Sequence, residues 1–410
     1  MGIQAEKIRE RITELARYTA TPGNGVTRFP FTEESRQAGN LIGNWMREAG
    51  LSVRLDDTGS IIGRLEGENP GTVMIGSHMD SVKNGGAYDG AAGVVCAIAT
   101  AEELQASGFR PCYSLEVIAT NDEEGSRFRS GLFSPRAMLG QLGPEDLRDL
   151  RDDDGISAYE AMRRFGLDPE KTGRNVRKDI AAFLEIHIEQ GPVLEAAGRE
   201  IGIVDTIAGI RRYLITVRGR ADHVGTTPMR LRRDALSGAC RIIARLTERA
   251  AENPPAVATV GSLNVEPNII NIVPAKAEFT ADLRAPSDPM LQALHEGLMD
   301  DCRSVCSELG LEYEIRSLLD TGPVPMNRQI TDIFENSCIE RGFSHMHLVS
   351  GAGHDAMVFG AKVPAAMLFV PSTGGRSHCP EEHSEERILA MAAGIAADTM
   401  IKINQDRIFP

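Results

Sequence analysis

The chain has 410 residues, 42% hydrophobic and 25% charged, as expected of a globular protein with two or three domains. Its formal net charge of −14 argues against a nucleic-acid partner, which would require clustered Lys and Arg. The seven cysteines are odd in number and form no CxxC pair, so we expect no disulfide framework and a cytoplasmic location. No stretch approaches the roughly 20 apolar residues of a membrane span, so we expect no membrane partner.

Short apolar runs alternate with helical patterns over the first half of the chain, and this favours an α/β sheet. Residues 1–20 have the charge and apolar spacing of an amphipathic helix, and residues 91–104 that of a helix of small and apolar residues. Strands are expected over residues 73–76, 114–120 and 183–188, and each ends in polar residues. An open α/β sheet places its ligand site at such strand ends.

The pattern changes after about residue 209. We expect strands at 212–218, 257–265 and 277–284 and helices at 233–251 and 289–309, an order typical of a small α+β domain. Beyond residue 323 the α/β pattern returns, with a strong apolar strand at 364–370. The sequence therefore predicts a discontinuous domain, residues 1–210 and 325–410, with an insertion at 211–324.

Histidines and carboxylates gather at the predicted strand ends. His78 and Asp80 are two residues apart, so in a strand they face the same side, where His78 could bind a metal and Asp80 could orient it. Alone, this pair is weak evidence. Asp89 lies among glycines before a helix, where an ordinary N-cap is the simpler interpretation.

Two further clusters follow later strands. Glu123 and Glu124 would usually form a solvated loop, but one could ligate a metal while the other takes a proton from water. Alternation places Glu185, His187 and Glu189 on one strand face, where burial is costly unless they are paired or bound to metal.

A glycine-rich loop after the last predicted strand delivers His378 as a further candidate ligand, with His383 as a competitor that more simply begins a helix. Together these residues form a set of nitrogen and oxygen ligands that suits zinc, manganese or a similar divalent ion. Two ions sharing one carboxylate would lie about 3.5–4 Å apart and activate water at neutral pH.

Ordered motifs along nearly the whole chain resemble the M20 metallopeptidase-like superfamily, in its branch of allantoate amidohydrolases and N-carbamoyl-L-amino-acid hydrolases. The motifs are GVTRFPFT, GSHMDSVKNGGAYDG, DEEGSRF, EIHIEQGP, ADHVGTTPM, NIINIVP, DLRAP, SGAGHDA and GGRSHCPEE. The resemblance implies a zinc-peptidase-like α/β catalytic domain with a mixed sheet and an inserted ferredoxin-like α+β domain. The insertion would form a homodimer.

The resemblance also implies roles for individual residues. One of two divalent ions per subunit (zinc or manganese, with cobalt or nickel possible) would be held by His78, Asp89 and His187. Asp89 would bridge to the other ion, held with Glu124 and His378. Glu123 would be the general base and Asp80 would orient His78. The expected substrate-binding residues are Gln190, His223, Asn271, Arg284 and Gly353, with His223 reaching the partner subunit's site and stabilising the oxyanion.

One position departs from the family pattern, which usually reads Ser-His-Asn-Pro at the final ligand. Here Cys379 follows His378, so we expect the metal site to persist while metal affinity or oxidation sensitivity changes.

The shared motifs leave the substrate open between allantoate and an N-carbamoyl-L-amino acid, both small anionic ureido acids. Paired arginines, Arg211 and Arg212, favour allantoate, because a second ureido arm needs polar partners. The simpler interpretation of the pair is a surface ion pair, and we assign substrate contact to Arg212. A dipeptidase, an aminoacylase or a metal-free binding relative remains a further alternative, against which the complete ligand set and His187 argue.

Overall fold

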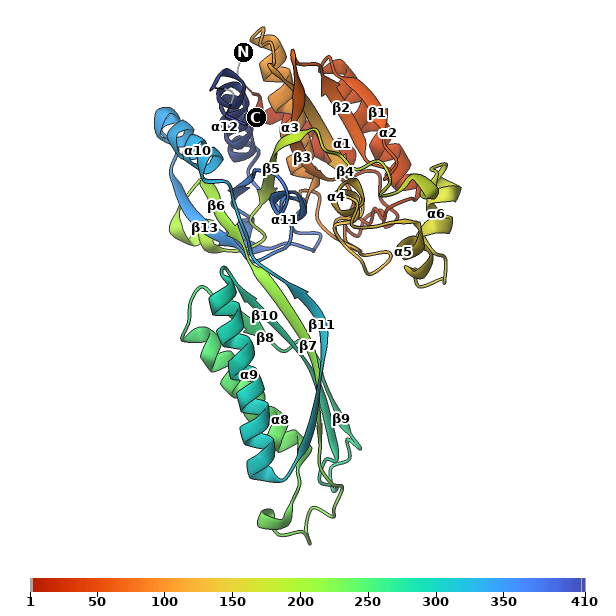
Figure 1. Ribbon diagram of the computed structural model, residues 1–410, viewed down its shortest axis with the longest axis vertical. Helices are drawn as coiled ribbons and strands as arrows, with labels where there is room; N and C mark the ends of the chain where they lie inside the picture. Colours follow the sequence, from red (N-terminus) through yellow and green to blue (C-terminus); the bar gives the residue numbers. More distant parts are fainter. Residues whose placement is uncertain (1–2, 407, 410) are drawn as a thin grey trace. The chain divides into compact units, whose positions relative to one another are not determined.

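The computed structural model describes residues 3–406 and 408–409. The chain forms two compact units (Figure 1). The first contains the residues up to Asp205, Met326–Leu348 and those from Gly353 onward, and the second contains Thr206–Pro325 and Val349–Ala352. The catalytic and dimerisation roles expected for the two parts of the chain stay predictions.

A mixed sheet with the order β1-β2-β4-β3-β5-β14-β6-β12, with β13 paired to β6, organises the first unit. The central strands β4, β3, β5 and β14 are parallel, while β2 and β6 join them antiparallel, which confirms the expected mixed α/β sheet. The strands are β1 (Ser52–Leu55), β2 (Ile61–Leu65), β3 (Asn69–His78), β4 (Tyr113–Thr120), β5 (Ile180–Ile188), β6 (Ile201–Ile207), β12 (Val324–Pro325), β13 (His345–Ser350) and β14 (Ala365–Val370).

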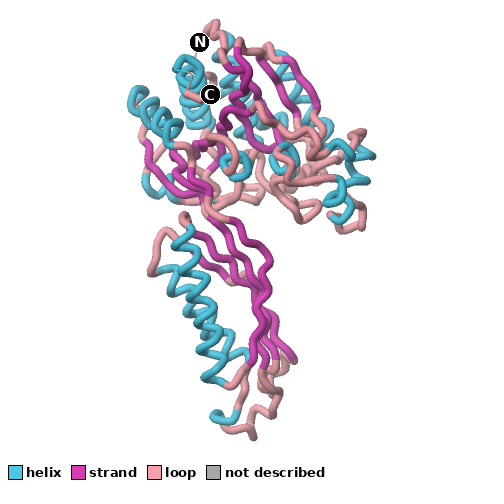
Figure 2. Tube along the Cα trace, in the orientation of Figure 1, coloured by secondary structure: helices cyan, strands magenta, loops and turns pink. Residues whose placement is uncertain are grey.

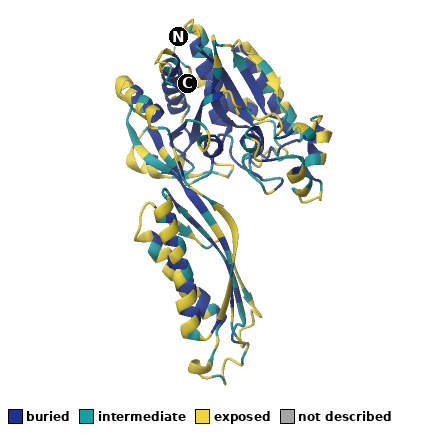
Figure 3. Cartoon of the chain, viewed as in Figure 1, coloured by how far each residue is buried: buried dark blue, intermediate teal, exposed yellow. Residues whose placement is uncertain are grey.

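Helix α3 (Ala91–Ala106) is largely buried, because its small and apolar side chains pack on β3, β4 and β5 and on α12 (Glu386–Asp406) (Figure 3). Its N-terminus follows the loop that carries Asp89, so the packing of α3 fixes that loop. The other α-helices of this unit are α1 (Ala5–Leu15), α2 (Glu33–Glu48), α4 (Phe133–Met138), α5 (Pro144–Asp149), α6 (Ala158–Phe165), α7 (Val193–Ala197), α10 (Arg328–Arg341) and α11 (Asp355–Gly360), with 3-10 turns at Pro169–Lys171 and Thr373–Gly375.

The second unit is a sheet covered on one face by two helices (Figure 2). Burial alternates along β10, because every second side chain packs into a core with α8 and α9 while the others point away from it. Its elements are β7 (Gly209–Arg218), a 3-10 turn at Met229–Leu231, α8 (Ala235–Ala251), β8 (Val257–Thr259), β9 (Leu263–Glu266), β10 (Lys276–Ala285), α9 (Asp288–Leu309) and β11 (Glu312–Thr321).

One sequence-based prediction in this unit was wrong, and one strand was given no range. The strand expected at 257–265 is split into β8 and β9, because three residues lie between Thr259 and Leu263 but only two lie between their partners Asp282 and Phe279. The extra residue interrupts the ladder as a bulge does. Strand β11 was not predicted, because its side chains are almost all exposed and give no alternating apolar pattern.

Among the described residues, no helix is both long enough and apolar enough to cross a membrane.

Candidate metal centre

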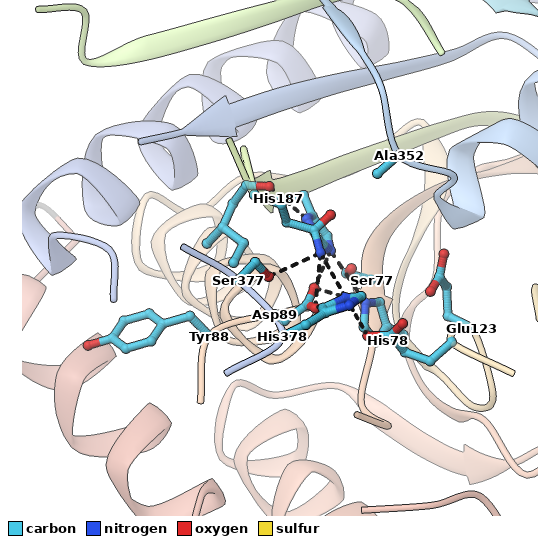
Figure 4. A network of polar contacts seen from close by, with 12 residues as sticks. Ser77, His78, Tyr88, Asp89, Glu123, His187, Ala352, Ser377 and His378 are labelled. Carbon is cyan, nitrogen blue, oxygen red and sulfur yellow. Dashed lines mark hydrogen bonds and ion pairs between the residues drawn. The ribbon is translucent and has the colours of Figure 1, made fainter. Parts of the chain in front are cut away.

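The carboxyl ends of four neighbouring parallel strands of the first unit meet at one edge of its sheet. His78 ends β3, Glu123 and Glu124 follow β4, His187 lies near the end of β5, and His378 lies in the loop after β14. Asp89 enters from the loop between β3 and α3. Figure 4 shows His78, Asp89, His187 and His378 pointing toward one another, as expected for a ligand site at strand ends.

The first candidate ligand group consists of His78, Asp89 and His187, all buried. The Nδ1 atom of His78 lies 3.1 Å from the main-chain oxygen of Asp80, and Nδ1 of His187 lies 2.9 Å from that of Ile188. A carbonyl oxygen only accepts, so each Nδ1 donates its proton, and in the neutral ring each Nε2 presents a lone pair. These Nε2 atoms are 3.3 Å apart and lie 3.6 Å (His78) and 3.2 Å (His187) from Asp89 Oδ1.

The second candidate group consists of Asp89, Glu124 and His378. Nε2 of His378 lies 3.1 Å from Asp89 Oδ2 and 3.3 Å from Glu124 Oε1. Asp89 therefore offers one oxygen to each group. The His378 side chain is 49% exposed, so the second group is the one open to solvent.

These distances fit a pair of divalent ions. A four-coordinate zinc ion with bonds of about 2.0–2.1 Å keeps its ligand atoms about 3.3 Å apart, close to the separations observed here. Two buried oxygens, Asp89 Oδ1 and Glu124 Oε1, have no hydrogen-bond partner among the described residues. Nitrogen and oxygen atoms that converge on one buried point from several elements suit a bound cation. Two further possible ligand groups overlap this centre, namely His78 with Glu123 and Glu124, and Glu185 with His187 and His354.

The ionisation of the centre reflects its density of charge. Burial opposes the charged form of His78, but the carboxylates of Asp89, Glu123 and Asp80 outweigh it and raise the pKa of His78 well above the usual value. The neighbouring carboxylates of Asp89 and Glu124 raise the pKa of His378 to about 10. Burial, reinforced by the negative charge of Glu124, raises the pKa of Glu123 well above its usual value. A carboxyl group with a raised pKa is suited to accept and then return a proton near neutral pH.

Asp80 is positioned differently from the expected arrangement. Strand β3 ends at His78, and the Asp80 carboxylate lies 3.7 Å from His78 Nδ1, too far for a hydrogen bond, so its main-chain oxygen orients the ring instead. The carboxylate accepts from the backbone N–H groups of Glu123 (3.1 Å) and Glu124 (3.2 Å). It thereby fixes the loop that carries both glutamates.

Glu189 lies just beyond the end of β5, and its carboxylate caps helix α7 by accepting from the backbone N–H groups of Val193 and Leu194. Glu185 accepts from Ser77 Oγ and from the backbone N–H of Ala356. Of the three polar residues at this strand end, His187 is thus the one whose side chain contacts both His78 and Asp89.

Glu382 is a component of the site that the sequence analysis missed. Its buried carboxylate accepts from the backbone N–H groups of Tyr88 (3.0 Å) and Asp89 (2.9 Å) through Oε1. Its Oε2 accepts from Ser377 Oγ at 2.7 Å and from the backbone N–H of His378 at 3.3 Å. A Cβ on Gly86 would lie 2.1 Å from Oε1, so a glycine is required opposite this carboxylate. In the sequence, the glycines of the GGAYDG loop were the available sign that another group packs closely against this loop.

The residues expected to bind substrate fall into both units. In the first, the Gln190 amide donates to Asp89 Oδ2 (3.0 Å) and Ser377 Oγ (3.2 Å), and a Cβ added to Gly353 would meet open space. Gln190 and His378 both adopt positive φ, a conformation that side chains with a Cβ rarely take. Such conformations recur at functional sites.

In the second unit, Arg284 donates to both carboxylate oxygens of Asp282 at 2.8 and 3.2 Å and to the carbonyl oxygen of Gly351 at 2.6 Å. Arg212 donates to the same Asp282 at 2.6 Å, whereas Arg211 turns toward Asp320 and Gln292. The three residues Arg212, Asp282 and Arg284 line a hollow with Val257, Thr259 and Leu318.

His223 and Asn271 lie together elsewhere in the second unit, where both side chains are exposed. His223 bridges to Ile272, and the backbone N–H of Val224 donates to the carbonyl oxygen of Asn271 at 3.2 Å.

A mixed α/β sheet with histidines and carboxylates converging at its strand ends defines a metal-dependent hydrolase of the zinc-peptidase type. Residues 74–402 match the family model described as Peptidase family M20/M25/M40. A Geobacillus stearothermophilus protein named N-carbamoyl-L-amino acid amidohydrolase is 39% identical over 98% of this chain and 99% of its own. A Bacillus subtilis protein named allantoate amidohydrolase is 38% identical over 97% of both chains.

A crystal structure from Burkholderia multivorans, described as an amidase of the hydantoinase/carbamoylase family, superposes with a TM-score of 0.91 at 31% identity over 98% of both chains. The chain belongs to peptidase family M20/M25/M40 and, within it, to the group of amidohydrolases to which these relatives belong. The expected family is thereby confirmed.

Proposed function

We propose that this chain hydrolyses the ureido C–N bond of a small ureido acid, with allantoate as the substrate. Water and allantoate would give ureidoglycine, ammonia and carbon dioxide. The observation that carries the proposal is the pair of ligand groups that share Asp89, with Glu123 beside them. The names of the relatives support hydrolysis of a non-peptide C–N bond.

The proposal assigns one divalent ion to His78, Asp89 and His187 and a second to Asp89, Glu124 and His378. Zinc or manganese suits these nitrogen and oxygen ligands, and cobalt or nickel is possible. When bound, such ions polarise the ureido carbonyl and lower the pKa of water. Glu123 takes the proton from the attacking water and returns it to the departing nitrogen, which the raised pKa of this carboxyl group favours.

Substrate recognition is assigned to the expected polar residues. Arg284 binds the substrate carboxylate through its planar guanidinium, which matches a carboxylate better than an ammonium does. Gln190 and Asn271 read the planar ureido group, Gly353 offers its backbone, and His223 stabilises the oxyanion. Arg212 supplies a further donor beside Arg284, and its position on the same carboxylate, Asp282, supports this assignment.

The proposal includes a homodimer formed through the second unit, in the cytoplasm. Exposed apolar residues lie close in sequence to His223 and Asn271 there, and Ile270 is fully exposed. The exposed apolar residues of these loops are Val224, Met229, Leu231, Ile269 and Ile270. Exposed apolar groups of this kind favour burial against a second copy. His223 would then act in the partner subunit's site.

An N-carbamoyl-L-amino acid is the second candidate substrate. The hollow that contains Arg284 is also lined by Val257, Ala281 and Leu318, which would suit an apolar amino-acid side chain. The relatives with this name are as similar to the chain as those named after allantoate.

The deciding experiment compares ammonia release from allantoate and from N-carbamoyl-L-methionine by protein loaded with zinc, manganese, cobalt or nickel. We expect a higher kcat/KM for allantoate with the best metal. The reverse ranking would transfer the assignment to the carbamoyl amino acid, and turnover of neither compound would reject ureido hydrolysis.

A further inference from the structure

The GVTRFPFT motif, which the candidate metal centre does not account for, contains a buried arginine. Arg28 is 2% exposed. Burial lowers the pKa of Arg28 to about 10, against the opposing effect of the negative charge of Asp80, so the guanidinium is charged at neutral pH. A charged group is costly to bury unless its hydrogen bonds are satisfied. The partners of Arg28 therefore indicate what its burial achieves.

The guanidinium of Arg28 donates to three main-chain carbonyl oxygens. Nε donates to Met79 at 2.6 Å, and Nη1 donates to Leu15 at 3.0 Å and to Tyr18 at 3.1 Å. Leu15 is the last residue of α1, where carbonyl oxygens lack their helical partners and a cation is favourable. Arg28 thus ties the end of α1 to the residue that follows the candidate ligand His78.

The main chain around Arg28 pairs with the loop that follows β3 and leads to Asp89. The N–H of Arg28 donates to Ser81 Oγ at 2.9 Å, and the N–H of Ser81 donates to the carbonyl oxygen of Arg28 at 3.1 Å. Two residues earlier, Val26 exchanges both main-chain hydrogen bonds with Gly85, at 2.9 and 2.8 Å. This segment therefore fixes the path of the chain from β3 toward Asp89.

Arg28 contacts the residues on either side of Asp80, and both polar groups of Asp80 serve the candidate metal centre. The main-chain oxygen of Asp80 lies 3.1 Å from Nδ1 of His78. Its carboxylate accepts from the backbone N–H groups of Glu123 and Glu124. A shift of Asp80 would therefore move a ligand ring and the loop of two carboxylates together.

We propose that Arg28 is a positioning residue of the metal centre, which fixes the main chain at Met79 and Ser81 and thereby orients His78. The proposal rests on the metal centre of the proposed function but not on the identity of the substrate. Arginine suits this role because its planar guanidinium donates in several fixed directions at once, whereas the ammonium of lysine is a compact charge on a flexible stem. Without Arg28 the chain after β3 loses this anchor, so a folded chain should bind zinc more weakly.

The test measures the zinc affinity of the full chain by competition with a zinc-binding dye, for wild type, Arg28→Met and Arg28→Lys. We expect zinc binding about 10–100-fold weaker in Arg28→Met, the usual effect of removing a group that orients a ligand, and an intermediate affinity in Arg28→Lys. Arg11→Met is the matched control, because Arg11 is also buried but contacts Glu102 and the Trp45 ring rather than the loop after β3. It should lower the melting temperature and leave the zinc affinity unchanged.

A second measurement follows the geometry of the centre itself. The visible absorption spectrum of bound cobalt depends on the arrangement of its ligands. We expect the spectrum to change in Arg28→Lys and to stay as in wild type in Arg11→Met, and this comparison decides the matter even if Arg28→Met does not fold.

Wild-type zinc affinity and an unchanged cobalt spectrum in the folded Arg28 variants, at a lower melting temperature, would overturn the proposal and leave Arg28 with a role in stability alone. A wild-type chain that binds no zinc would reject the metal centre and this proposal with it. Failure to hydrolyse ureido acids, with zinc bound, would reject only the proposed substrate, because neither measurement uses one.

Discussion

Asp89 Oδ1 lies 3.2 Å from Nε2 of His187, whose Nδ1 donates to the carbonyl oxygen of Ile188. The other oxygen of Asp89 faces His378 at 3.1 Å. A single carboxylate thus joins two ligand groups. Asp89, which in the sequence alone resembles a helix cap, therefore lies at the middle of the candidate metal centre.

Replacing Asp89 should therefore remove both ions. Asp89→Asn keeps the size of the side chain but replaces an anionic oxygen with a donor, so neither ligand group remains complete. We expect the zinc content measured by mass spectrometry to fall by two ions per chain relative to wild type. Asp153→Asn, at a carboxylate that is 87% exposed, is the control. Two ions retained by Asp89→Asn would contradict the bridging role.

Replacing Glu123 should separate metal binding from turnover. Glu123→Gln removes the group that moves the proton, and general acid–base catalysis typically contributes about 10²–10⁴-fold. We expect kcat to fall by about that factor while both catalytic ions stay bound. Unchanged kcat would remove Glu123 from the mechanism. Loss of metal would instead identify Glu123 as a ligand, in the possible ligand group that it forms with His78 and Glu124.

Replacing Glu382 should loosen two loops at once. Its carboxylate holds the backbone of Asp89 and of His378, so Glu382→Ala leaves buried N–H groups without acceptors at about 1–3 kcal/mol each. We expect weaker zinc binding together with a lower melting temperature. The neighbouring Glu381→Ala is a matched control, because Glu381 is exposed and pairs with the exposed Arg376. Equal zinc affinity in the two variants would show that Glu382 has no positioning role.

Replacing Arg284 should mainly affect substrate binding. Lys keeps the charge but cannot donate to Asp282 through two nitrogens and also bind a carboxylate in a plane. We expect Arg284→Lys to raise KM about tenfold or more with a smaller change in kcat. Arg211→Lys should leave KM unchanged, because Arg211 turns toward Asp320. Equal KM values for wild type and Arg284→Lys would exclude carboxylate binding at this residue.

Acid should weaken the contact between α10 and α12. Burial opposes ionisation of Asp398, but hydrogen bonds from Arg341 and Ser337 lower its pKa below the usual value. A lowered pKa stabilises the fold above the unfolded value of about 3.9, and this stabilisation is lost as the pH falls through the folded pKa. Both partners are more than a third exposed, so we expect Asp398→Asn to cost only about 1 kcal/mol at pH 7.

Denaturant unfolding at pH 7 and at pH 3 measures this difference. The difference in unfolding free energy between wild type and Asp398→Asn should be smaller at pH 3, where the wild-type carboxylate begins to be protonated. Asp332→Asn on α10 is the control and should change little, since Asp332 is exposed and lies 3.9 Å from Arg328. A cost that is equal at both pH values would contradict an electrostatic origin.

The parts of the fold that follow from local sequence patterns could be predicted. Strands β3, β4, β5 and β14 are apolar and end in polar residues, so both their existence and the location of a site at their ends were evident. Strand β11 was missed because its exposed side chains are specified by pairing with β7, which no local pattern encodes.

The site shows the same division between local and long-range information. His78 and His187 follow from strand position, and their tautomers follow from backbone carbonyls that only the folded structure reveals. Glu382 was not predicted, because two of its four donors lie almost 300 residues away in sequence and the others lie in its own turn. Asp80 was expected to orient His78, but the strand ends at His78 and the carboxylate turns to the Glu123 loop.

The most direct test of the central claim is anomalous X-ray diffraction from crystals of the zinc-loaded protein. We predict two zinc peaks about 3.5–4 Å apart, one on each side of the Asp89 carboxylate. A single peak or none beside Asp89, with His78, Glu124, His187 and His378 not coordinating zinc, would contradict the account.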